Sequence, residues 1–286
     1  MERKKLYVIF VVRILFFIHS GTRDNSNIDV YECSKCHTKQ LNSIVENDYA
    51  NGFMNGKRMT AQEICDRLND CKIDDERRAT MVAPWIQGKN VLDFGCGFGG
   101  FINTASKIAK SISGVELGND ELDYMTARGY DVKNSIEKFD SEFDVITLFH
   151  VFEHLKNPRG WLDIIASKIK KDSLLFIEVP NGNDALLSLY ENSSFADFTY
   201  WSAHLYLYTK ESLTNIVNET GVFEIEDEGQ FQRYPLSNHL YWLSKGKPGG
   251  QNIWSFLNTE LINKEYKSIL EKENMCDTLF YRIRKK

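Results

Sequence analysis

The sequence lacks three features, and each absence excludes a class of protein. The apolar run Leu6 to Ile18 has only thirteen residues and contains Arg13, so it is too short to span a bilayer as a helix. There is no excess of positive charge: the net charge is −5, which argues against a nucleic-acid partner. Finally, no second Cys-x-x-Cys accompanies Cys33 and Cys36, so we expect a degenerate knuckle and no bound metal.

The cysteines and the N-terminal segment give indications of the cellular compartment of the protein. The six cysteines have no regular spacing, which is typical of reduced thiols rather than of a disulfide framework. The basic start followed by an apolar run resembles a signal peptide, but Arg13 in its middle is unfavourable there. The run could instead be the first strand of a small N-terminal subdomain, or an unnatural start of the reading frame. We expect a cytoplasmic chain that is not exported.

Alternation of strands and helices predicts an α/β fold, with a mainly parallel Rossmann-like sheet covered by helices on both faces. We divide the 286 residues into a leader and mostly helical cap (1–79), a cofactor domain (80–232) and a C-terminal acceptor-side extension (233–286). Helical periodicity is found in residues 60–68, 75–85, 101–111 and 252–273. The expected strands are residues 90–94, 111–116, 130–133, 143–149, 173–179 and 223–228.

The segment Val91 to Phe101 carries the most information. A short apolar strand runs into a turn that contains Gly95, Gly97 and Gly100, and a helix follows. This order is typical of a nucleotide-type cofactor site, and the glycines alone would also fit NAD. Acidic residues at two strand ends, Asp93 and Glu116, instead favour S-adenosylmethionine (SAM), which is cationic and has ribose hydroxyls to bind.

With two further segments, residues 143–158 and 174–181, this region resembles class I SAM-dependent methyltransferases. The resemblance covers roughly residues 90 to 182 and implies the cofactor SAM. It also implies a set of cofactor-binding residues that lie after the first four strands of the domain. These are Asp93, Gly95, Cys96, Gly97, Phe98, Glu116, Leu117, Ser135, Ile136, Phe149 and His150.

Methyl transfer to an alcohol needs a base, and a histidine near the methyl group is the natural candidate. His204 is the first choice, since its segment resembles one that faces the acceptor in sugar methyltransferases. Ala203 stands where many of those relatives have glutamate. His150, after the fourth strand, is the second choice. For His154 we expect packing or capping.

A third group of residues suggests the acceptor. Arg233, His239, Lys245 and Lys247 gather positive donors in one segment, and with Tyr200 they could bind the phosphate of a nucleotide-linked sugar. The segment resembles one in methyltransferases of surface-polysaccharide gene clusters.

The leading interpretation is O-methylation of a nucleotide-linked or phosphorylated sugar. The alternatives are C-methylation of a keto-sugar, methylation of a small metabolite such as a quinone, an inactive SAM-binding scaffold and an NAD-linked sugar enzyme. The sequence does not indicate an oligomeric state.

Overall fold

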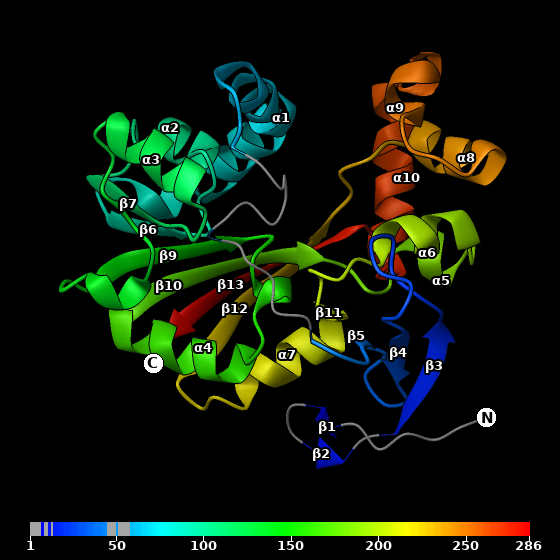
Figure 1. Ribbon diagram of the computed structural model, residues 1–286, viewed down its shortest axis with the longest axis horizontal. Coiled ribbons are helices and arrows are strands. Elements are labelled where there is room, and N and C mark those ends of the chain that lie inside the picture. Colours follow the sequence, from blue (N-terminus) through cyan, green and yellow to red (C-terminus); the bar gives the residue numbers. More distant parts are fainter. Residues whose placement is uncertain (1–6, 9–10, 13, 45–49, 51–57) are drawn as a thin grey trace.

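The computed structural model of the protein describes residues 7–8, 11–12, 14–44, 50 and 58–286. A seven-stranded sheet, with strand order β12-β13-β10-β9-β6-β7-β8, forms its centre (Figure 1). The strands are β6 (Asn90–Phe94), β7 (Ser111–Val115), β8 (Val132–Lys133), β9 (Phe143–Phe149), β10 (Ile169–Pro180), β12 (Phe223–Phe231) and β13 (Thr278–Lys285).

Neighbouring strands from β8 to β10 run parallel, and β13 pairs antiparallel with both β10 and β12. Central strands with both faces covered are mainly apolar, and Leu92, Ile146, Leu148, Leu175 and Ile177 are completely buried. All six expected strands are present, with ends that differ by a few residues.

Helices cover both faces of this sheet. On one side lie α1 (Ala61–Ile86), α2 (Gly100–Ala105) and α3 (Asn119–Ala127), and on the other lie α4 (Pro158–Lys168) and α7 (Lys210–Asn218) (Figure 1). Short 3-10 turns, η2 (Ile136–Lys138) and η3 (Phe152–His154), follow β8 and β9. The predicted α/β class with a mostly parallel, Rossmann-like sheet is confirmed.

The predicted helices differ from the observed ones in their bounds, and the region 252–273 contains a 3-10 turn at Ser255–Leu257 before a helix at Glu260–Lys272. Residues 60–68 and 75–85 belong to one helix, α1, which begins with a capping box between Thr60 and Glu63 and continues through Pro84. The helix predicted at 101–111 is shorter, because α2 ends at Ala105.

The N-terminal cap is not mostly helical, contrary to the expectation. Short strands β3 (Leu15–His19), β4 (Val30–Cys33) and β5 (Lys39–Leu41) form a four-stranded sheet with β11 (Tyr206–Leu207). Strand β3 lies at the end of the N-terminal apolar run, which agrees with the alternative that this run forms a strand of a small subdomain. A separate pair, β1 (Tyr7–Val8) and β2 (Val11–Val12), is antiparallel, and the basic start at residues 1–5 lies outside the described residues.

The division at residue 232 also needs correction. Strand β13, from the end of the chain, is inserted between β10 and β12 of the central sheet, so residues 233–286 are not a separate extension. The remaining helices are α5 (Ala185–Ser188), α6 (Ser193–Thr199), α8 (Leu236–Lys245), α9 (Gly250–Ile253), η4 (Ser255–Leu257) and α10 (Glu260–Lys272). Among the described helices, none combines the length and apolar character that a bilayer crossing requires.

Candidate functional site

The turn after β6 contains three glycines whose backbone conformations are unfavourable for other residues. Gly95, Gly97 and Gly99 have φ values of 82°, 52° and 77°, which residues with a Cβ adopt only with strain. A Cβ on Gly95 would meet Val151 Cγ2 at 2.3 Å, whereas nothing lies within 4 Å of a Cβ on Gly97. Gly97 therefore borders open space at the carboxyl edge of the sheet.

Glu116, just after β7, is fixed against this turn. Its Oε2 accepts a hydrogen bond from the Gly97 N–H at 2.8 Å. Its Oε1 accepts from the N–H groups of Leu117 at 2.6 Å and Gly118 at 3.0 Å. The carboxylate thus joins the ends of β6 and β7 and stands at the edge of the same open space.

Asp93, the penultimate residue of β6, is buried beside it. Its Oδ1 accepts a hydrogen bond from the Thr147 hydroxyl at 2.7 Å. Burial raises the pKa of Asp93 to about 7. The hydrogen bond from Thr147 opposes this shift, and the negative charge of Asp75 adds to it. Burial also raises the pKa of Asp75, on α1, to about 6, although Arg78 opposes the shift. Acidic groups held this way favour a cationic ligand.

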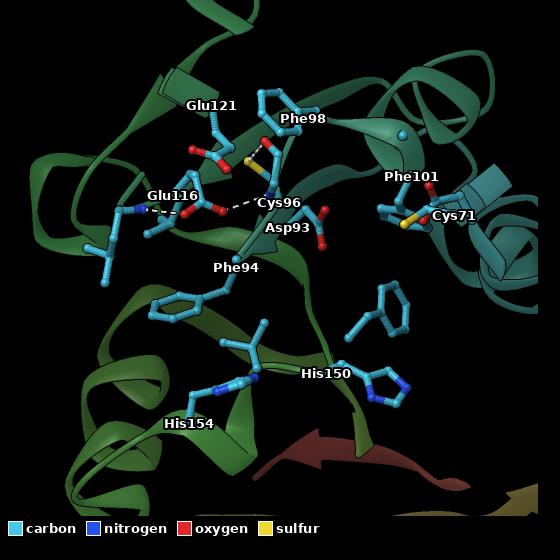
Figure 2. A pocket seen from close by; sticks show the side chains of 18 of the residues that line it. Cys71, Asp93, Phe94, Cys96, Phe98, Phe101, Glu116, Glu121, His150 and His154 are labelled. Carbon is cyan, nitrogen blue, oxygen red and sulfur yellow. Dashed lines mark hydrogen bonds between the residues drawn. The ribbon is translucent and has the colours of Figure 1, made fainter. Parts of the chain in front are cut away.

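These residues surround a cavity of about 560 Å³. Figure 2 shows Asp93 and Glu116 on one side of it, with His150 and His154 on the other. Every residue predicted to bind the cofactor lines this cavity: Asp93, Gly95, Cys96, Gly97, Phe98, Glu116, Leu117, Ser135, Ile136, Phe149 and His150. The structure brings them together, and their contact with a cofactor remains a prediction.

The wall formed by α1 was missed in the sequence. Leu68, Cys71, Asp75 and Arg78 all line the cavity. Their spacing of three, four and three residues places them on one face of a helix. This periodicity was a usable signal, but α1 precedes the glycine turn and carries no recognisable motif.

His150 lies where β9 ends, with φ = 55°. Its Nδ1 is 3.4 Å from Glu153 Oε1 and its Nε2 is 3.3 Å from Glu178 Oε1. Burial alone would lower the pKa of His150, but these two carboxylates raise it above its ordinary value. The imidazole is therefore held between two acidic groups at the cavity wall.

Glu178, on β10, also binds arginines from α1. It accepts hydrogen bonds at 2.9 Å from Arg77 Nη1, Arg77 Nη2 and Arg78 Nε. Burial alone would raise the pKa of Glu178, but His150, Arg78 and Arg77 hold it well below its ordinary value. This charged network ties α1 to the sheet beneath the cavity.

His204 reaches the cavity from the loop before β11. Burial lowers its pKa to about 3, which makes it a weak base. His154 Nδ1 donates to the Ala203 carbonyl at 2.8 Å, and the rings of His154 and His204 are 5.0 Å apart. Position 203 is alanine and has no carboxylate, but the carboxylate of Glu153 lies near His204.

The predicted phosphate-binding cluster does not assemble. Arg233 lines the cavity, but its guanidinium is paired with Asp74. His239 is buried, with its Nδ1 2.7 Å from the Tyr266 hydroxyl and its Nε2 3.1 Å from Gln232 Nε2. The remaining predicted residues, Tyr200, Lys245 and Lys247, are also absent from the cavity wall among the described residues.

The Cys-x-x-Cys pair lies outside this cavity. Cys33 and Cys36 are buried and pack with Leu15 and Tyr31 at the end of β4. All six cysteines fall within the described residues, and none forms a disulfide. In that part of the chain, no group of three His, Cys, Asp or Glu ligand atoms includes either cysteine.

Comparisons with known proteins agree on one family. The methyltransferase domain family matches residues 62–226. A ubiquinone biosynthesis O-methyltransferase from Shewanella halifaxensis is 30% identical over 113 residues, which is 36% of this chain and 48% of that protein. Its counterpart from Hydrogenovibrio crunogenus is 21% identical over 175 residues, or 54% of this chain and 73% of that protein. The chain spans about half the length of the first of these relatives.

Solved structures share the fold. A SAM-dependent methyltransferase from Archaeoglobus fulgidus has a TM-score of 0.50 and 22% identity, and the match covers 77% of this chain and 97% of that one. At this identity the likeness concerns the fold alone.

Proposed function

Because the chain belongs to the methyltransferase domain family, we propose that it transfers the methyl group of SAM to a hydroxyl oxygen of a small aromatic acceptor, such as a quinone precursor. The expected resemblance to class I SAM-dependent methyltransferases is confirmed. The two relatives reported above do not support the finer resemblance to sugar methyltransferases. SAM supplies a methyl group on a positively charged sulfur, so the protein's task is mainly to align the acceptor and remove its proton.

The acidic side of the cavity fits SAM. Asp93 and Asp75 are buried acids with raised pKa values, although Arg78 lies 3.5 Å from Asp75, and a sulfonium or ammonium group would stabilise their ionised forms. Gly97 leaves room for a ligand against the backbone. In this proposal Glu116 binds the ribose, Asp93 faces the methionyl amino group, and Ser135 and Ile136 lie near the adenine.

Apolar side chains of the cavity wall support an aromatic acceptor. They include Leu155 and the aromatic rings of Phe149, Trp161 and Trp201, which offer apolar contacts to a ring. A nucleotide sugar would require binding groups for two phosphates, and the lysines expected for that purpose are not at this wall. The names of the matching relatives point the same way, since both are O-methyltransferases of ubiquinone biosynthesis.

We assign the role of base to His150 rather than to His204. His150 lines the cavity between the carboxylates of Glu153 and Glu178. In this proposal the buried Nε2 carries the proton of the neutral imidazole and faces Glu178, Nδ1 takes the proton of the acceptor hydroxyl, and the two carboxylates stabilise the imidazolium that forms. His204 is poorly suited, because burial makes its protonated form unfavourable. The aligned hydroxyl oxygen can then take the methyl group as its proton leaves.

A turnover screen tests this function. Purified protein is supplied with SAM and a panel of dihydroxybenzenes, hydroxylated quinols, nucleotide sugars and nucleotide-linked keto-sugars, and formation of S-adenosylhomocysteine is measured. We expect turnover with the aromatic hydroxyl compounds. Turnover with nucleotide sugars alone would contradict the acceptor class. Tight SAM binding without turnover on any acceptor would favour the scaffold alternative.

A further inference from the structure

A second cluster of ligand-type side chains lies beside the proposed base. Glu153 and His154, on η3 after β9, meet His204 from the loop before β11. One ligand atom from each of the three residues lies within 4.8 Å of the other two. The two histidines line the cavity, whereas Glu153 is completely buried beneath it.

Glu153 and His204 have buried polar atoms that lack a hydrogen bond within the described part of the chain. Neither carboxylate oxygen of Glu153 has a hydrogen-bond partner there, and neither has Nδ1 of His204. The imidazole nitrogens nearest to Glu153 are His150 Nδ1 at 3.4 Å and His154 Nε2 at 3.9 Å, and both face Oε1. Oε2 of this buried carboxylate and Nδ1 of His204 therefore have no partner among the described residues, which indicates a missing ligand.

A hydrogen bond from His154 fixes the orientation of that ring. Its Nδ1 donates to the Ala203 carbonyl at 2.8 Å, which leaves Nε2 as the nitrogen on the side of Glu153, 3.9 Å from Oε1. Metal-ligating histidines usually donate their second ring N–H to a backbone carbonyl or a carboxylate in this way, which leaves the other nitrogen for the metal. The contact also connects the two segments that carry the three side chains.

We propose that Glu153, His154 and His204 bind a divalent cation of the zinc type. Two imidazoles and one carboxylate are a ligand set that Zn²⁺ favours, whereas Mg²⁺ and Ca²⁺ prefer oxygen ligands alone. Three protein ligands would leave one position of a tetrahedral ion open, and the two histidines of the set line the cavity. This site differs from the Cys33–Cys36 pair, and the proposal departs from the sequence-based expectation of no bound metal.

The role of the ion rests on the proposed function, but its binding does not. A hydroxyl oxygen of the acceptor could take the open position, where the ion would lower its pKa. The proton would pass to His150, and the oxygen would form its bond to the methyl carbon. The carbon–sulfur bond would break with its electron pair left on sulfur, so no further reactant is needed.

Zinc binding to the full chain tests the site without SAM or acceptor, so failure of methyl transfer cannot be mistaken for failure of this proposal. Chelator-treated protein is titrated with Zn²⁺ by calorimetry, and bound zinc is counted by elemental analysis. We expect one zinc per chain. Glu153→Gln and His204→Ala should each weaken zinc binding by more than about 100-fold. This loss of affinity is larger than the loss expected when the removed residue only orients a metal ligand.

Two control variants are matched to this test. His19→Gln changes a histidine that pairs with Asp197 outside the cavity, and the double variant Cys33→Ser with Cys36→Ser removes the other ligand-type pair. Both should keep the zinc. If Glu153→Gln does not fold, as judged by circular dichroism, His154→Ala takes its place, since His154 lies at the cavity wall. Absence of zinc in the folded wild type, its persistence in the ligand variants, or its loss in the cysteine variant would overturn the proposal.

Discussion

Glu178 holds His150 through both its main chain and its side chain. The Glu178 carbonyl accepts the His150 N–H at 2.7 Å, and the Glu178 carboxylate lies 3.3 Å from His150 Nε2. The contact continues the parallel pairing of β9 with β10, in which Phe149 lies opposite Glu178. The sheet therefore sets the position of the proposed base, and the arginines of α1 hold the carboxylate that orients it.

Replacing the proposed base should affect turnover and leave cofactor binding nearly unchanged. His150→Gln removes the proton acceptor but retains a polar side chain, so we expect turnover to fall by roughly 10²–10⁴-fold. Steady-state kinetics with the best acceptor, together with calorimetric SAM titration, would measure both effects. His19→Gln should behave as the wild type. Near-normal turnover in His150→Gln would remove His150 from the mechanism.

SAM binding should strengthen as the pH rises through about 7. Burial raises the pKa of Asp93 to about 7, so the ligand-free protein must release a proton there before the carboxylate can face a cation. Calorimetry in buffers of different ionisation enthalpy would detect this proton release. Asp93→Asn should abolish the pH dependence and weaken binding by about 1.5–3 kcal/mol. An unaltered pH profile in the variant would disprove the assignment.

Asp93 should also make the stability of the ligand-free protein depend on pH. Between its ordinary value of 3.8 and about 7, the folded protein holds a proton on Asp93 that the unfolded chain has lost. The free energy of unfolding should therefore fall across this window as the pH rises, and less so in Asp93→Asn. Denaturant titrations at several pH values would measure it, and equal slopes for the two proteins would contradict the prediction.

Two glycines offer a matched test of the cofactor position. Gly97 and Gly129 both have positive φ, at 52° and 79°, and a Cβ on either would meet nothing within 4 Å. Alanine at either site should therefore cost roughly 1–2 kcal/mol of stability. Because Gly97 borders the cavity, Gly97→Ala should also weaken SAM binding by about 1–3 kcal/mol through overpacking. Equal SAM affinities in the two variants would argue against a ligand at this turn.

The lysines at the end of α8 should have no part in acceptor binding. Lys245 and Lys247 do not line the cavity among the described residues, so Lys245→Ala and Lys247→Ala should change the acceptor KM by less than about twofold. Initial-rate measurements over a range of acceptor concentrations would test this. A large rise in KM with unchanged kcat would restore the phosphate-anchor hypothesis.

The parts of the site that could be predicted share a local cause. Val91 to Phe101 combines a buried strand with a turn whose backbone conformation requires glycine, so residues close in sequence also form the wall of the cavity. Asp93, Glu116 and His150 follow because the carboxyl ends of parallel strands meet at one edge. A visible pattern was missed in β13, where the buried residues Leu279, Tyr281 and Ile283 alternate with Phe280, Arg282 and Arg284.

What could not be predicted depends on contacts between distant segments. His239, Lys245 and Lys247 follow Arg233 closely in sequence, but α8 starts at Leu236 and takes them away from the cavity. The pairing of Glu178 with Arg77 and Arg78 joins residues about a hundred positions apart. The low pKa of His204 likewise arises from burial, which the motif around it does not reveal.

The fate of a labelled methyl group tests the proposed reaction most directly. The protein is incubated with SAM carrying a carbon-13 methyl group and the aromatic acceptor that gives the highest turnover, and the product is examined by NMR. The account predicts a labelled methoxy group on the ring, formed in equal amount to S-adenosylhomocysteine, and its loss in His150→Gln. Label on a ring carbon, or on a nucleotide sugar in preference to any aromatic hydroxyl, would contradict it.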